Sequence, residues 1–211
     1  AKTVDVSVYE RNKEAADTEN RYILTCKNTD KICIFTNKGQ MHLLKVLDLP
    51  YGKFRDKGIP IDNLSNYNSS EENFIYIINL GAIIHSRLLF GTKTAMLKMV
   101  DGSEFDVAKR TTASTKLNED DELLIVHAMT GEETVVMQSE KEMFLRIEAS
   151  TIPEKKKGAV GVRGMKLNAG DALSNIYVLD GENEQTVEVK GKEVVLNRLR
   201  VGNRDTKGTK R

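Results

Sequence analysis

Short apolar runs, each the length of one β-strand, recur along the whole chain and limit the fold more than any other feature of the sequence. No stretch keeps apolar residues at helical spacing long enough to bury a helical face. The best candidate, residues 12–22, has too few large apolar side chains. We therefore predict an all-β protein. The runs are YILTC, KICIFT, MHLLKV, NFIYIIN, TAMLKMV, EFDVAK, LLIVHAM, TVVMQS, EMFLRIE, NIYVL, QTVEVK and EVVLNRLRV.

Tight turns join several of these runs into predicted hairpins. The turns fall at residues 35–41, 100–105, 139–144 and 189–195, where Asn, Asp, Gly or charged residues interrupt the apolar pattern. Two polar stretches, 12–20 and 65–73, are predicted to be exposed loops.

The hairpins belong to an internal repeat. KLNEDDEL begins at Lys116 and KLNAGDAL at Lys166, an offset of 50 residues (166 minus 116). Each unit consists of a hairpin, a basic loop containing glycine, a short strand, an acidic turn and an apolar strand. This length and content match a propeller blade.

The repeat predicts one domain over residues 1–211 with four to five blades. Residues 1–29, which include VDVSVYE and YILTC, are expected to supply strands of an incomplete blade. The predicted blades cover residues 30–80, 93–130, 133–180 and 184–211.

Positive charge is concentrated although the chain as a whole is nearly neutral, with 32 basic and 31 acidic residues. Basic residues gather after each hairpin, and acidic residues gather in other turns, at 118–122, 131–133 and 180–184. If equivalent loops of successive blades line one rim, the basic loops form a belt. The candidate belt residues are Lys45, Lys53, Arg55, Lys57, Lys109, Arg110, Lys155, Lys156, Lys157, Arg163, Lys166, Arg204 and Lys207.

A curved belt of lysine and arginine is typical of sequence-independent binding to duplex DNA through counterion release. No recognition helix or other base-reading module is evident. For KKKG at 155–158 taken alone, an ordinary solvated loop is the more common interpretation. The recurrence of basic residues after the hairpin of every unit favours a DNA-binding role. The alternative is a protein-interaction propeller without DNA binding, which a large apolar patch on one face would favour.

Other chemistry finds little support in the sequence. His42, His85 and His127 are scattered without metal-ligand spacing, and Cys26 and Cys33 are expected to be free thiols. No glycine pattern matches a nucleotide-binding loop. The paired acids Asp120 and Asp121 are expected to be solvent-facing caps or turn residues. We predict no cofactor, no metal and no catalytic residue. No apolar run reaches the length of a membrane span, so a cytosolic protein is expected.

Two long motifs match a known family. FTNKGQMHLLKVLDLPYGKFRDKGIPIDNL at 35–64 resembles the second blade of the C-terminal domain of the DNA gyrase A subunit. There a turn ending in Lys-Gly, a Lys-Val strand, a Pro-containing loop and Lys-Gly-x-Pro-Ile-x-Asn-Leu follow in this order. KGAVGVRGMKLNAGDAL at 157–173 resembles a later blade. The order agrees over nearly the whole chain, least over 81–112. The chain thus resembles the C-terminal domain of the A subunit of bacterial type IIA DNA topoisomerases, either DNA gyrase or topoisomerase IV.

The resemblance implies a β-pinwheel, whose blades exchange hairpins and whose rim wraps and bends duplex DNA for an ATP-dependent, nucleoid-associated enzyme of the cytoplasm. The partners that it implies are the rest of the A subunit, together with the ATPase subunit. The cleavage tyrosine and the ATPase belong to other regions, so this piece is not expected to be an enzyme by itself.

Two departures from the family pattern matter. The basic Gln-Arg-Arg-Gly-Gly type of box of gyrase A subunits is absent and by alignment would fall just before Ala1, which leaves gyrase and topoisomerase IV both open. Glu104 and Asp106 stand where the family usually shows basic or neutral residues, and are expected to weaken the belt there.

Overall fold

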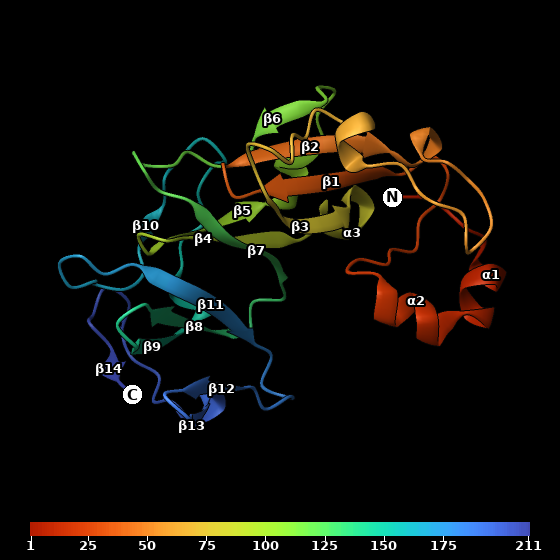
Figure 1. Ribbon diagram of the computed structural model, residues 1–211. Helices are drawn as coiled ribbons and strands as arrows, with labels where there is room; N and C mark the ends of the chain where they lie inside the picture. Colours follow the sequence, from red (N-terminus) through yellow and green to blue (C-terminus); the bar gives the residue numbers. More distant parts are fainter.

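The computed structural model describes residues 1–211. It consists of antiparallel sheets that follow one another along an arc (Figure 1). The strands are β1 Lys31–Thr36, β2 Gln40–Lys45, β3 Phe74–Asn79, β4 Arg87–Thr92, β5 Met96–Asp101, β6 Thr111–Ala113, β7 Leu123–Met129, β8 Thr134–Ser139, β9 Met143–Glu148, β10 Val162–Arg163, β11 Leu173–Leu179, β12 Thr186–Val189, β13 Lys192–Val195 and β14 Thr209–Lys210. Three sheets have four strands each, in the orders β3-β1-β2-β6, β10-β5-β4-β7 and β11-β8-β9-β14, and β12 and β13 form a fourth, two-stranded sheet. The prediction of an all-β class is confirmed.

Each four-stranded sheet takes its outer strand from the next unit of the chain. β6, β10 and β14 each follow the hairpin of one unit but pair with the second hairpin strand of the unit before it, namely β2, β5 and β9. Glycine permits the close approach of these strands, since a Cβ on Gly161 would lie 2.6 Å from the carbonyl oxygen of Leu97. Successive units are therefore linked by exchanged strands as well as by packing.

Neighbouring sheets pack face to face, so each hairpin strand is buried on both sides. In β4, Leu88 and Phe90 pack in one cluster with Phe35 of the first sheet, whereas Leu89 packs in another cluster with Met137 of the third sheet. A strand buried on both faces needs apolar side chains at successive positions. This explains why the strands appear in the sequence as continuous apolar runs.

Helices are short and few. They are α1 Val6–Arg11, α2 Lys13–Glu19 and α3 Leu80–Ile83, with 3-10 turns η1 Val46–Asp48, η2 Ile61–Asn63, η3 Gly102–Phe105, η4 Ala149–Thr151 and η5 Leu196–Arg198. None is long and apolar enough to cross a membrane. Four of the 3-10 turns, η1, η3, η4 and η5, directly follow a hairpin, and this recurrence marks the same point in each unit.

The N-terminal prediction was wrong, because residues 6–19 form α1 and α2 instead of strands and a loop, and 22–26 have no regular structure. Local contacts stabilise these helices. Lys13 forms an ion pair with Asp17 at 2.6 Å, and the hydroxyl of Tyr9 donates to Asp17 at 2.9 Å. No neighbouring sheet edge pairs with this segment. Its alternating pattern therefore does not produce a strand.

The second hairpin was also misplaced. Its turn lies at 92–96, between β4 and β5, and the run RLLFGT of β4 was not recognised as a strand. The predicted turn at 100–105 and the run EFDVAK instead form η3 and a loop. Asp101 accepts a hydrogen bond from the amide of Ser103 at 2.9 Å, which begins the 3-10 turn. This unit thus begins near residue 87.

The stretch 65–73 has no helix or strand, as predicted, but it is not fully exposed. Tyr67 and Glu72 are buried. A carboxylate oxygen of Glu72 lies 2.6 Å from Nε2 of His42 in β2, and the tyrosine hydroxyl donates to the carbonyl of Glu72 at 3.1 Å. This loop therefore closes over one face of the first sheet.

Candidate nucleic-acid interface

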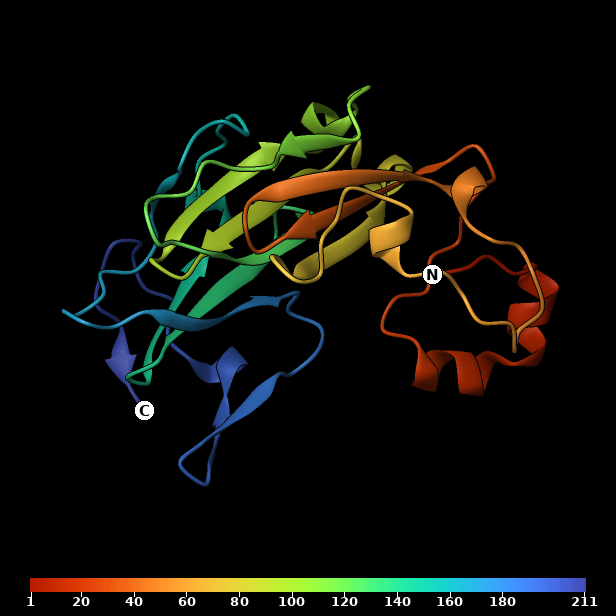
Figure 2. The ribbon, with the colours of Figure 1, turned by 45° about the horizontal axis from the view of Figure 1, so that its top comes forward.

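Four connections occupy the same position in successive units, and we call them the rim loops. They cover residues 49–59, 106–110, 152–161 and 199–208, and each follows the 3-10 turn that ends a hairpin unit. In Figures 1 and 2 they follow the outer margin of the arc, from orange at the right, through green at the top, to teal and dark blue at the left. The third strand of each sheet, β3, β7 or β11, lies at the opposite edge.

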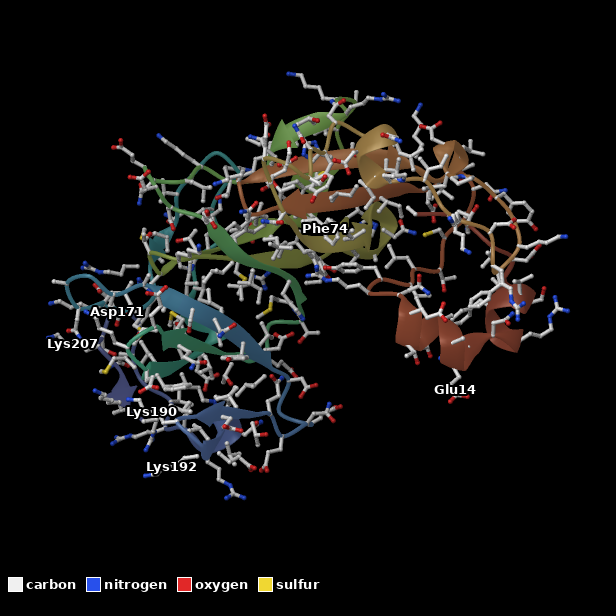
Figure 3. All side chains as sticks on the ribbon, viewed as in Figure 1. Glu14, Phe74, Asp171, Lys190, Lys192 and Lys207 are labelled. Atoms are coloured by element: carbon white, nitrogen blue, oxygen red, sulfur yellow. The ribbon has the colours of Figure 1, made fainter.

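The predicted belt residues all lie in these loops or directly beside them. Lys45 ends β2, Arg163 lies in β10, and Lys166 follows that strand. Lys207, labelled in Figure 3, lies at the margin of the molecule in the fourth rim loop. The structure therefore aligns these residues along one edge, although they are far apart in the sequence.

Most of the belt side chains are available to a ligand. Eight of them are exposed and form no ion pair or side-chain hydrogen bond with the protein. They are Lys45, Lys53, Arg55, Lys57, Lys109, Lys155, Lys166 and Lys207.

Two belt arginines are partly neutralised by acidic neighbours. Arg110 lies 4.0 Å from a carboxylate oxygen of Asp48. Arg163 donates to Asp205 at 2.5 and 3.3 Å, and this hydrogen bond raises the pKa of Arg163 and lowers the pKa of Asp205. Arg204 is half-buried and donates to the carbonyl of Arg163 at 2.9 Å. These residues offer less free charge than their number in the sequence suggests.

The lysine triplet of the third rim loop divides into three different environments. Lys155 is free, whereas Lys156 pairs with Glu104 at 3.2 Å. Lys157 is half-buried; its ammonium donates to the carbonyl of Glu104 at 3.2 Å, and its amide donates to the carboxylate of Glu104 at 2.7 Å. Glu104 belongs to the second unit, but its negative charge acts on the loop of the third.

A buried lysine beneath this loop was not predicted. Lys98 in β5 is 1% exposed, and its Nζ donates to three carbonyl oxygens of the third rim loop. Lys2 makes equivalent contacts with the first rim loop. A sequence signal exists, because Lys-x-Val-Asp occurs at both 2–5 and 98–101. A lysine inside an apolar run is ordinarily interpreted as a surface residue.

The acidic turns have a structural role. Asp121 is buried, and its carboxylate accepts from the amide and the hydroxyl of Thr94 at 3.0 and 2.6 Å. The next unit repeats this contact. Its Asp171, labelled in Figure 3, accepts a hydrogen bond from the amide of Lys141 at 3.2 Å. Each aspartate thus caps the turn of a hairpin. Asp121 is a cap as predicted, but it is buried instead of facing solvent, because its carboxylate is used by Thr94.

The sequence matches a known family and its members. The model of the family described as DNA gyrase C-terminal domain, beta-propeller, matches residues 86–128 and 133–180, which are two successive units. The A subunit of DNA gyrase from Staphylococcus epidermidis is 31% identical over 196 residues, which cover 89% of this chain and 22% of the relative. The corresponding protein of Lawsonia intracellularis is 29% identical over 194 residues, with 88% and 23% covered. The chain belongs to the DNA gyrase C-terminal domain family. It spans about a fifth of the length of these curated relatives.

Solved structures of such C-terminal domains share the fold. The C-terminal domain of a DNA topoisomerase IV superposes with a TM-score of 0.86 at 20% identity, covering 99% of this chain and 68% of that one. The C-terminal domain of E. coli ParC gives a TM-score of 0.74 at 14% identity, with 88% and 78% covered. A DNA gyrase A C-terminal domain gives 0.64 at 21%, with 88% and 61% covered. These likenesses confirm the predicted β-pinwheel architecture.

Proposed function

We propose that this domain binds duplex DNA along its rim loops without sequence preference, and bends it, as an accessory domain within the A subunit of a type IIA topoisomerase. The observation that carries the proposal is the set of eight exposed, unpaired basic side chains in or beside the rim loops of successive units. Phosphates at regular spacing along a curved duplex would meet loops at regular spacing along the arc. The DNA would then be presented for strand passage to the rest of the A subunit, which works with an ATPase subunit.

The physical basis of binding is the release of counterions from phosphates. A protein that neutralises about six to ten phosphates loses roughly three to five decades of affinity between 50 and 200 mM salt. Bending some tens of base pairs costs on the order of a few kcal/mol, which contacts along several rim loops must offset. Affinity should therefore depend steeply on salt and only weakly on sequence.

The test compares wild-type protein with K155A/K156A and with R55A/K57A, using duplexes of unrelated sequence. We expect each double variant to weaken binding to all duplexes alike and to lower the salt slope by about 1 to 2. A matched control is K190A/K192A at the tip of the fourth hairpin, labelled in Figure 3, which removes two exposed lysines outside the rim loops. Equal losses from control and rim variants would contradict a rim site.

One observation favours the alternative, a protein-interaction function. A groove of about 1180 Å³ lies between the N-terminal segment and the first sheet. Its lining includes most of the exposed large apolar side chains of the chain: Val6, Ile23, Leu24, Leu47 and Tyr51. This function predicts that V6S/I23S, at two exposed groove residues outside the rim loops, abolishes capture of a protein partner and leaves DNA affinity unchanged. Loss of DNA binding in that variant would place the DNA site at the groove instead.

A further inference from the structure

The ammonium of Lys98 uses all of its hydrogen-bonding capacity on one rim loop. It donates to the carbonyl oxygens of Lys156 at 3.1 Å, Lys157 at 3.0 Å and Ala159 at 2.6 Å. The ring of Phe90 lies beneath it, with 5.6 Å from Nζ to the ring centroid. An ammonium has three donors and no acceptor, so three carbonyls satisfy it fully. The third rim loop is therefore folded around a buried charge.

Lys2 repeats this arrangement at the first rim loop. Its ammonium donates to the carbonyls of Lys53, Phe54 and Asp56, which occupy the same relative positions as 156, 157 and 159. The next residue confirms the register, because Thr3 bridges to Tyr51 as Met99 bridges to Glu154. Two segments that are far apart in the sequence thus place a lysine ammonium under a rim loop in the same way.

The other two units lack the lysine, although Arg146 of β9 donates to the carbonyl oxygens of Asn197 and Leu199 where the fourth rim loop begins. The pairing of the exchanged strands places His42 of β2 and Leu145 of β9 at the position of Lys98. The lysine therefore occurs under the two loops in which three basic residues lie within five positions of one another, 53–57 and 155–157. This coincidence connects the buried lysine with the exposed ones above it.

We propose that Lys2 and Lys98 are positioning residues, each of which gathers three carbonyls of a rim loop and so fixes the loop in the shape that presents its basic side chains to DNA phosphates. The inference rests on the proposed function. A preordered loop binds more tightly because less conformational entropy is lost on binding. At Gly158 the third loop has little packing, since nothing lies within 4 Å of the position that a Cβ would occupy there.

The experiment uses the whole domain with the variants K98M, K98R and K155A/K156A, and the triple variant K98M/K155A/K156A. The control L145M changes the equivalent position of β9, where no lysine holds a loop. Affinity for a duplex and hydrogen exchange of the loop amides are measured together. The amides of Lys157 and Ala159 are protected by hydrogen bonds in the wild-type loop. Urea unfolding verifies that each variant is folded.

We expect K98M to weaken DNA binding by about three- to tenfold, the cost of ordering one or two lysine side chains only on binding. Exchange at Lys157 and Ala159 should become faster, K98R should restore part of both properties, and L145M should change neither. In the K155A/K156A background, K98M should cause no further loss, because its effect acts through those lysines.

Two results would overturn the inference. One is unchanged exchange and affinity in K98M, and the other is a loss of affinity that simply adds to that of K155A/K156A. If the wild-type domain itself fails to bind DNA, the proposed function fails. Hydrogen exchange in K98M then still decides whether Lys98 holds the loop.

Discussion

Glu104 occupies the donors that the third rim loop would offer to a phosphate. Its carboxylate accepts from the amide of Lys157 and pairs with Lys156, while its own side chain is only 16% exposed. Asp205 engages Arg163 in the same manner. At the residue scale the rim therefore contains acidic groups that, under the proposed function, would compete with DNA for its basic residues.

Replacing Glu104 by glutamine should strengthen DNA binding by about two- to fivefold at low salt, since one screened negative charge is removed from the binding surface. Fluorescence anisotropy with a labelled duplex measures this change. The control is E182Q, at an exposed acid that forms no ion pair. Weaker binding of E104Q would show that this carboxylate orders the loop more than it repels DNA.

Lys98 gives a pH dependence to stability. Burial lowers the pKa of its ammonium to about 8, while the negative charge of Glu104 opposes this shift. Below pH 8 the lysine is charged in both the folded and the unfolded state, and the cost of burial is fully present. Between pH 8 and about 10.5 the folded protein has lost this proton while the unfolded chain keeps it, so the cost disappears as pH rises.

We therefore expect the free energy of unfolding of the wild type, relative to K98M, to increase by about 1 to 3 kcal/mol from pH 7.5 to pH 10. Urea denaturation of both proteins at the two pH values measures this difference. A constant difference would mean that the three carbonyl contacts hold the pKa near its ordinary value.

At the scale of the element, the apolar runs predict most of the hairpin strands, but β4 is missed and the hairpin that it begins is misplaced because its turn lacks the usual turn residues. The turn between β4 and β5 has no glycine or asparagine; Ala95 adopts φ of 66° there, the place taken by Gly39 in the first hairpin with φ of 73°. Asp101-Gly102 has the composition of a hairpin turn, but Gly102 instead packs against the backbone of Ile83 and belongs to η3. Tertiary packing, and not the local turn composition, determines the backbone conformation at Ala95 and at Gly102.

The same limit applies to the candidate site. The exposed basic residues and their loops could be predicted, because charge clusters recur with the repeat. Their pairing with Glu104 and Asp205 could not, because these contacts join different units, with separations of 53 and 42 residues between the partners. The role of Lys98 depends on a loop that follows it by 58 residues or more.

Cys33 reports on the packing between the first two sheets. Its thiol is fully buried in a cluster with Phe35 and Phe105, and burial raises its pKa to about 12. A disulfide reagent should therefore label only Cys26 in the native protein, and Cys33 only after unfolding.

Replacing Phe105 by alanine should cost about 3 to 5 kcal/mol, because its ring packs on Phe35 at 5.0 Å between centroids. Labelling of Cys33 should then become much faster in native buffer, while labelling of Cys26 serves as the internal control. Equal reactivity of Cys33 in both proteins would contradict the packing of these two sheets.

At the scale of the whole molecule, the proposed function follows from the repetition of a simple unit along an arc. Each unit contributes a rim loop, and exchanged strands hold successive units in a fixed relation. A nearly neutral chain, with 32 basic and 31 acidic residues, thereby acquires an edge with a strong positive charge. Under the proposed function, bending of DNA requires several loops acting together.

The most direct measurement of this central claim is binding to duplexes of increasing length that carry a donor and an acceptor dye at their two ends, at several salt concentrations. We predict that affinity rises with length until the duplex reaches all the rim loops, and that energy transfer then increases because the ends approach each other. Tight binding that is independent of length, with no change in energy transfer, would contradict bending along the rim.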